Sequence, residues 1–153
     1  MLAFTERLSS PRPDDAIAKR SRNEIARSLA LTAEERTRTR YRFNTPEGES
    51  IVLCLPRGTV LRDRDVLRSP AGDLLQILAK PEPVLTVTAD DPLTLLRAAY
   101  HLGNRHVPLE VTATYLRLSP DPVLEAMLVQ LGVRAIAEVA PFNPESGAYR
   151  HSH

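Results

Sequence analysis

The chain has 153 residues, and its 20 Lys plus Arg against 19 Asp plus Glu give a formal net charge of +1 with His neutral. Proteins that bind nucleic-acid phosphates usually carry a marked basic excess, so we expect no nucleic-acid partner. No apolar run approaches the ~20 residues that span a bilayer, and the N-terminus lacks the apolar region of a signal peptide. Cys54 is the single cysteine. These features predict a cytoplasmic protein with no membrane contact and no internal disulfide.

Residues 1–80 predict a small all-β domain. The segment 2–8 is expected to open it as a strand, and the polar residues 9–27 are expected to form a loop. The segments 29–43 and 50–55 flank a turn in which Pro46 and Gly48 supply the fixed and permissive φ values of a tight reversal, so they predict a hairpin. A later apolar run, 74–79, predicts a further strand. We expect Cys54, among apolar neighbours, to be a small buried residue rather than a thiolate ligand.

The first arm of this hairpin carries four arginines at a spacing of two residues. Side chains alternate along a strand, so this spacing predicts one basic face, with the aromatic residues on the other face. A charged face of this kind usually only solvates a strand edge. The alternative interpretation is a docking surface for an acidic protein partner. The arginines are Arg36, Arg38, Arg40 and Arg42.

The two prolines in residues 80–83 predict a domain boundary, and a different periodicity follows it. After a strand at 84–89, Asp91 is a good N-cap and Pro92 suits the first helical position. We expect this helix to stop at Gly103. Its apolar residues at three- and four-residue steps predict the buried stripe, which would consist of Leu93, Leu96, Ala99 and Tyr100.

The rest of the chain predicts a hairpin at 109–118, a second helix after Asp121 and Pro122, and a last strand at 134–140. The second helix should bury Leu124, Met127, Leu128 and Leu131 and end at Gly132. The order βαββαβ is that of a ferredoxin-like domain. The fold class is therefore α+β, with an all-β domain at 1–80, a ferredoxin-like metal-binding and dimerisation domain at 81–140, and a mobile metal-binding tail at 141–153.

No catalytic constellation is present in the sequence, so we expect no enzyme: it contains no nucleophile elbow, phosphate loop or HExxH helix. The four histidines are the candidates for chemistry. His101 lies near a helix C-terminus, where a cationic ring is favoured by the dipole, and capping is its simpler interpretation. His106 precedes Pro108 at an exposed corner, and by spacing alone it is more often an ordinary surface residue than a ligand. His151 and His153 form a pair that can chelate at the chain end.

Four segments resemble the family of the urease accessory protein UreE, a nickel metallochaperone. Residues 99–109 (AYHLGNRHVPL) and 141–149 (PFNPESGAY), the latter followed by histidines, carry the most specific similarity. Residues 55–61 (LPRGTVL) and 121–131 are similar as well. The resemblance covers nearly the whole chain. It implies an N-terminal β domain followed by a ferredoxin-like metal-binding domain.

The resemblance also implies a function and a site. The family forms a homodimer through the C-terminal domain, and one histidine from each chain meets at the interface to hold Ni²⁺; this role falls on His106. The C-terminal histidines complete the coordination, which points to His151 and His153, with His101 as a weaker secondary candidate. Ni²⁺ would be cargo for apo-urease, and the GTPase of the maturation complex would be the immediate partner.

Two alternatives remain open at this stage. The first is a general divalent-metal buffer, because imidazole sites also bind Zn²⁺ and Cu²⁺. The second is a protein-binding module whose histidines are incidental. A metal titration separates the second alternative from nickel carriage, and urease genes beside this one would separate nickel delivery from general buffering.

Overall fold

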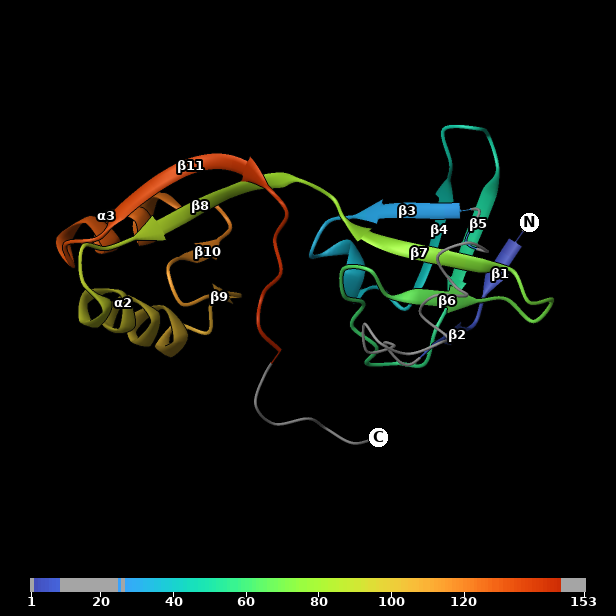
Figure 1. The fold of residues 1–153 in the computed structure, drawn as a ribbon, viewed down its shortest axis with the longest axis horizontal. Helices are drawn as coiled ribbons and strands as arrows, with labels where there is room; N and C mark the ends of the chain where they lie inside the picture. Colours follow the sequence, from blue (N-terminus) through green and yellow to red (C-terminus); the bar gives the residue numbers. More distant parts are fainter. Residues whose placement is uncertain (1, 9–24, 26, 147–153) are drawn as a thin grey trace. The chain divides into compact units, whose positions relative to one another are not determined.

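A computed structural model describes residues 2–8, 25 and 27–146 of the chain (Figure 1). The chain forms two compact units, which divide between Lys80 and Pro81. The loop predicted at 9–27 lies almost entirely outside the described residues. Within the described ranges, neither helix has the length and apolar character needed to cross a bilayer.

The N-terminal unit is built of short strands. Its elements are β1 (Leu2–Phe4), β2 (Glu6–Arg7), β3 (Arg27–Leu31), the 3₁₀ helix η1 (Glu35–Thr37), β4 (Arg40–Asn44), β5 (Ser50–Cys54), β6 (Val66–Arg68) and β7 (Leu74–Ala79). One sheet has the order β1-β5-β4 and the other the order β2-β6-β7-β3. The β1–β5 and β3–β7 pairs are parallel, and the remaining pairs are antiparallel. Apolar residues from both sheets form one core, which includes Phe4, Ile51, Leu53, Leu75 and Ile77.

The predicted hairpin is present as β4 and β5. Its turn is closed by two backbone bonds, from the Thr45 N–H to the Glu49 carbonyl (2.8 Å) and from the Gly48 N–H to the Thr45 carbonyl (2.9 Å). Gly48 has a φ of 85°, which an L-residue with a side chain rarely adopts. The Tyr41 and Phe43 rings lie 3.9 Å apart, centroid to centroid, on the more buried face of β4.

The prediction of four arginines on one strand face is wrong. Only Arg40 and Arg42 lie on β4, and both are exposed. Arg36 belongs to η1, is 3% exposed, and donates through Nη1 to the Leu31 carbonyl at 3.2 Å. Arg38 follows η1 and bonds Glu34. The 3₁₀ turn breaks the period of two, so the basic face consists of two arginines.

The predicted burial of Cys54 is also wrong. Side chains alternate along β5, so Ile51 and Leu53 point into the core while Cys54 is exposed. An apolar neighbourhood in sequence therefore did not indicate an apolar neighbourhood in space.

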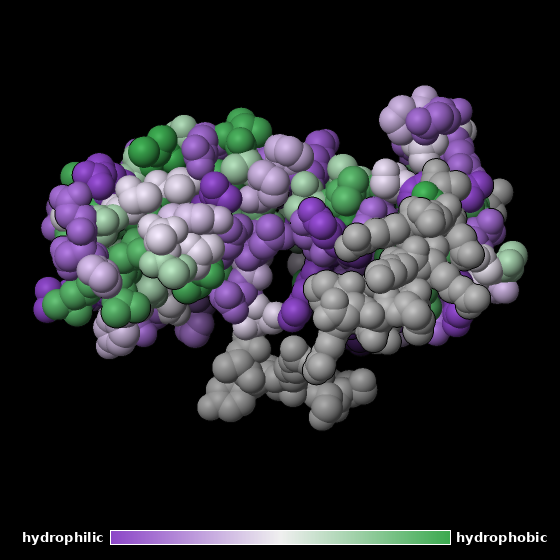
Figure 2. Space-filling model, in the orientation of Figure 1, coloured by the Kyte–Doolittle hydropathy of each residue, from purple (hydrophilic) through white to green (hydrophobic). Residues whose placement is uncertain are grey.

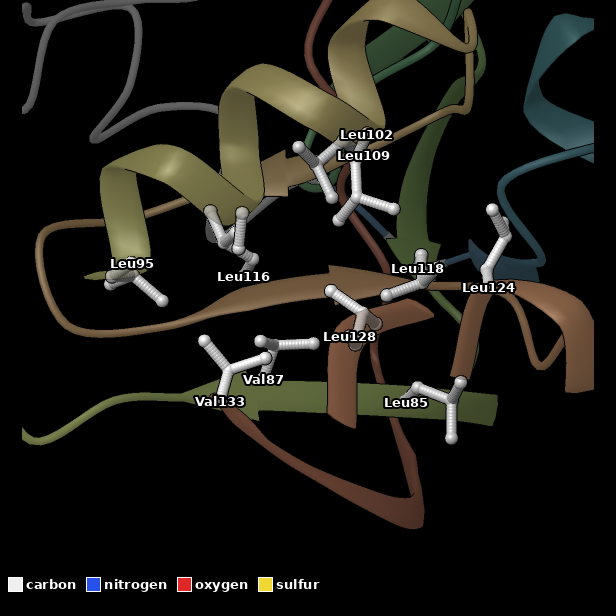
Figure 3. Close-up of a cluster of buried hydrophobic side chains, with 11 residues drawn as sticks. Leu85, Val87, Leu95, Leu102, Leu109, Leu116, Leu118, Leu124, Leu128 and Val133 are labelled. Atoms are coloured by element: carbon white, nitrogen blue, oxygen red, sulfur yellow. The ribbon is translucent and has the colours of Figure 1, made fainter. Parts of the chain in front are cut away.

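The C-terminal unit is a four-stranded antiparallel sheet with two helices. Its elements are β8 (Glu82–Thr88), α2 (Pro92–Asn104), β9 (Glu110–Val111), β10 (Leu116–Leu118), α3 (Pro122–Gln130) and β11 (Arg134–Ala140). The sheet order β11-β8-β10-β9 is the ferredoxin-like arrangement, so the predicted fold class is confirmed. Figure 3 shows the core between helices and sheet, where leucines such as Leu85, Leu102, Leu116, Leu118 and Leu128 meet.

Both helices begin as predicted. The Asp91 carboxylate accepts the Thr94 N–H at 2.9 Å at the start of α2, and Asp121 caps α3 in the same way. Proline occupies the first turn of each helix. The Thr94 hydroxyl and the Thr94 N–H hold the pKa of Asp91 below its usual value.

The predicted buried stripe of α2 is displaced. Leu95, Ala98 and Leu102 face the core, whereas Leu93, Leu96 and Tyr100 are each more than half exposed. Apolar residues occur on both sides of this helix, so periodicity alone could not select the inner one. The stripe predicted for α3 agrees better, with Leu124 and Leu128 buried and Met127 and Leu131 packed against them.

Candidate metal centre

Helix α2 ends in a Schellman motif that is centred on His106. The His106 N–H donates to the Gly103 carbonyl at 3.0 Å, and the Val107 N–H donates to the Leu102 carbonyl at 3.4 Å. Leu102 is fully buried, and Val107 packs against the same core. The helix continues through Gly103, so the predicted stop at that glycine is wrong.

Helix α3 ends in the same motif with a different residue at its centre. The Gly132 N–H donates to the Val129 carbonyl at 3.1 Å, and the Val133 N–H donates to the Leu128 carbonyl at 3.4 Å. Gly132 has the left-handed conformation that this position requires, with a φ of 87°. Gly132 is therefore the counterpart of His106 in the second half of the fold.

His106 adopts the left-handed conformation despite its side chain, with a φ of 56°. A non-glycine residue there carries a steric cost of roughly 1 kcal/mol, and such strain persists where the surroundings impose it. The conformation turns the chain sharply after the helix and leaves the imidazole exposed. The geometry thus presents one accessible imidazole on a corner that backbone hydrogen bonds hold in place.

An apolar surface leads along α2 to this corner. Leu93, Leu96 and Tyr100 lie at steps of three and four residues, and thus on one side of the helix. Figure 2 shows apolar surface over α2 among polar residues. His101 is exposed near the end of the helix, and its ring meets the Tyr100 ring edge-on at 5.4 Å. Contiguous exposed apolar residues of this kind mark interaction surfaces.

The segment after β11 is attached to the opposite edge of the sheet. The Asn143 N–H donates to Glu110 Oε1 at 2.7 Å, and the Glu145 N–H donates to the Leu109 carbonyl at 2.8 Å. β9, which contains Glu110, is the outer strand on that side. In Figure 1 the chain leaves β11 and runs down past β9. Glu145 is therefore bonded to Leu109, which follows His106 by three residues in the chain.

Glu110 is itself held by charge and burial. It is 7% exposed, and its Oε2 lies 3.7 Å from Arg117 Nη1. Arg117 also bonds Thr86 (3.1 Å) and Glu138 (3.3 Å). Its guanidinium lies 4.5 Å from the centroid of the Tyr115 ring. Burial and the neighbouring Glu110 carboxylate raise the pKa of Tyr115.

The structure locates some of the predicted ligands. His101 and His106 are both exposed on or after α2, whereas His151 and His153 lie outside the described residues. Across residues 2–8, 25 and 27–146, no three His, Cys, Asp or Glu side chains converge as a metal cage would. Sequence reasoning missed Glu110, because a buried acid on an edge strand has no distinctive local pattern.

These features define a class: a two-domain α+β protein whose ferredoxin-like domain presents a histidine at a strained helix end beside an apolar surface. The comparisons with known proteins name the family. The UreE urease accessory protein models match residues 4–80 with the N-terminal domain and 82–153 with the C-terminal domain. The chain belongs to this family, so it is an accessory protein and not an enzyme.

Individual relatives are similar over the whole length. The urease accessory protein UreE of Microcystis aeruginosa is 57% identical over 159 aligned positions, which cover 100% of this chain and 95% of the relative. The proteins of the same name from Nostoc sp. and Nostoc punctiforme are each 54% identical, covering 100% of this chain and 99% and 98% of the relatives. The family resemblance expected from the sequence is confirmed.

Proposed function

We propose that this protein is a cytoplasmic nickel carrier that delivers Ni²⁺ to apo-urease from a histidine site shared across a homodimer. His106 is the fixed ligand of each chain, His151 and His153 are ligands on a mobile tail, and His101 is a secondary candidate. Imidazole nitrogen suits Ni²⁺, and two His106 rings plus tail imidazoles can fill four or more coordination positions.

The observation that carries the proposal is the contrast between the two helix ends. α3 places glycine at the left-handed position of its Schellman motif, whereas α2 places His106 in the same motif. Glycine satisfies the backbone there at less cost, so a histidine is explained by a use for its ring. An exposed imidazole on a fixed corner is suited to ligation.

A dimer is supported by the surface beside this corner. Leu93, Leu96 and Tyr100 leave apolar area exposed on α2, and burying it against a second copy would be favourable. In a two-fold dimer the same surface of both copies is in contact, and residues beside the symmetry axis meet their own counterparts. An axis that passes beside the C-terminal end of α2 would bring the two His106 rings together. One chain supplies only a single nitrogen at this position, so the site requires both chains.

A carrier must also release its cargo. Tail ligands lose chain entropy each time they coordinate, so they bind weakly and exchange readily, while His106 stays fixed. Release would occur to the maturation GTPase and the apo-urease complex. The exposed Arg40 and Arg42 of the N-terminal unit are the residues we propose for protein docking, and their positive charge favours an acidic partner.

Calorimetric titration with Ni²⁺ tests this site. We expect His106→Ala to abolish tight binding while the dimer persists. Replacing His151 and His153 together by Ala should leave a weaker site, with a deficit of about 1–3 kcal/mol. His101→Ala, which removes the exposed imidazole on α2 itself, is the matched control and should retain most of the affinity. If the tail variant eliminates binding and His106→Ala has no effect, the interface site is wrong and the tail alone is the chelator.

A transfer assay separates delivery from metal buffering. The Ni²⁺-loaded protein is mixed with apo-urease and the maturation GTPase, and urease activity is measured. We expect activation by the wild type and none by His106→Ala. If the protein were a general Zn²⁺ buffer, neither the wild type nor His106→Ala would activate urease. If it were a protein-binding module with incidental histidines, it would not bind Ni²⁺ tightly.

A further inference from the structure

Two backbone donors fasten residues 141–146 to the edge of the C-terminal sheet. The Asn143 N–H meets the Glu110 carboxylate at 2.7 Å, and the Glu145 N–H meets the Leu109 carbonyl at 2.8 Å. Phe142, between β11 and these bonds, is 2% exposed. The chain thus crosses from β11 at one edge to β9 at the other before the terminal residues begin.

Glu110 is suited to hold this segment. Its side chain is largely buried, so its carboxylate needs partners, and the Asn143 N–H is one of them. The hydrogen bond is charge-assisted, which makes it stronger than a bond between neutral groups. Arg117, tied to Thr86 and Glu138, fixes the carboxylate from the other side. The bond therefore connects the segment to a network that spans all four strands of the sheet.

The position of this attachment matters because of chain reach. Leu109 follows His106 by three residues, a span of at most about 11 Å. His151 follows Glu145 by six residues, which reach at most about 22 Å when extended. A tail that starts at Glu145 therefore begins within reach of the His106 corner. A tail that lost these two hydrogen bonds would instead be tethered at the buried Phe142, nine residues before His151.

We propose that Glu110 is a positioning residue for the metal site: its carboxylate holds residues 141–146 on the sheet edge, so that the tail histidines start beside the corner that carries His106. This inference rests on the proposed nickel site. The effective concentration of a tethered ligand falls roughly as the −3/2 power of tether length. Lengthening the tether from six to nine residues then weakens the tail contribution about twofold.

The test is a double-mutant cycle in the full-length protein, read as Ni²⁺ affinity by calorimetry. Glu110→Ala should weaken Ni²⁺ binding about twofold in the wild-type background. It should have no effect when His151 and His153 are both alanine, because the tail then supplies no ligand. Equal losses in both backgrounds would show that Glu110 acts through the fold, and no loss in the wild-type background would show that it positions nothing. Either result overturns the proposal.

Three further variants isolate the hydrogen bond. Glu110→Gln keeps an acceptor oxygen and should retain the affinity. Asn143→Pro removes the donor N–H while leaving the buried network intact, and it should reproduce the loss even if Glu110→Ala does not fold. Glu125→Ala removes an exposed carboxylate of α3 that takes no part in this network, and it should leave Ni²⁺ affinity unchanged. A loss in Glu125→Ala equal to that in Glu110→Ala would contradict the proposal.

Amide hydrogen exchange gives a readout that needs no metal. The Glu145 amide should exchange faster in Glu110→Ala and in Asn143→Pro, and at the wild-type rate in Glu125→Ala. Unchanged exchange in the first two variants overturns the positioning role. The proposed function fails separately, if His106→Ala leaves Ni²⁺ binding intact, so the two failures are distinguishable.

Discussion

The amide of Val107 bonds the carbonyl of Leu102 at 3.4 Å, and this bond closes the end of α2 around a histidine in the left-handed conformation. The bond from Val133 to Leu128 closes α3 in the same way around glycine. The fold thus places histidine and glycine at the same position of two similar helix ends, so that the cost of the histidine can be measured.

His106→Gly should stabilise the metal-free protein while removing the proposed ligand. Glycine adopts φ values near 56° without a Cβ clash, whereas alanine retains the clash. We expect His106→Gly to be more stable than His106→Ala by about 1 kcal/mol in urea unfolding followed by the helical signal. The reverse change, Gly132→Ala, should destabilise by a similar amount. A glycine variant no more stable than the alanine variant would show that the corner carries no strain.

Charge on the exposed side of α2 should prevent the proposed dimer. Leu96→Asp together with Tyr100→Asp places two carboxylates on a surface that would otherwise be buried, and buried unpaired charge is strongly unfavourable. We expect a monomer in sedimentation analysis, a retained fold, and weaker Ni²⁺ binding. Val60→Asp, at an exposed apolar residue of the N-terminal unit, should leave both unchanged. A dimer that survives the double substitution would place the interface elsewhere.

The arginines of the N-terminal unit should separate into two kinds. Arg36→Ala leaves the buried Leu31 carbonyl without its side-chain donor and should cost about 2 kcal/mol of folding free energy. Arg40→Glu with Arg42→Glu should preserve stability and Ni²⁺ stoichiometry. If β4 docks an acidic partner, the double change should slow association with the maturation GTPase and reduce its salt dependence. Unchanged association kinetics would assign this strand face to solvation alone.

Acid should weaken the start of α2. The Thr94 hydroxyl and N–H hold the folded-state pKa of Asp91 below that of the unfolded chain, near 3.9. The stabilisation is complete above that pH and is lost as pH falls through the lowered value. Asp91→Asn keeps an acceptor that does not titrate. The advantage of the wild type in thermal midpoint, followed by the helical signal, should therefore shrink below about pH 4; a constant advantage would contradict the cap.

Much of the fold was predictable because its signals are local. Asp91 and Asp121 precede prolines and start both helices, and Gly132 ends the second. Those signals also fixed the βαββαβ order. The prediction of which side of α2 is buried was wrong, because Leu93 and Leu96 are as apolar as the buried Leu95. Packing against the sheet decides which side is covered.

The candidate site was predictable only in part. The position of His106 before Pro108 predicted an exposed corner, and its role as a ligand was implied only by the family resemblance. Its left-handed conformation was not predicted, since a histidine gives no such signal and Gly103 offered a more ordinary stop. The contact between Glu110 and Asn143 joins residues 33 positions apart, so no local pattern could indicate it. The predicted three-part division, with residues 141–153 as a separate tail, stays a prediction.

The bond between Asn143 and Glu110 also has a consequence for biosynthesis. It closes a loop that contains β10, α3 and β11, so it forms only after those elements have been made and packed. Residues 141–146 follow those elements in the chain, so they leave the ribosome after them. A nascent or partly folded chain therefore cannot hold residues 141–146 at the sheet edge, and the proposed metal site would be completed together with the folded domain rather than before it.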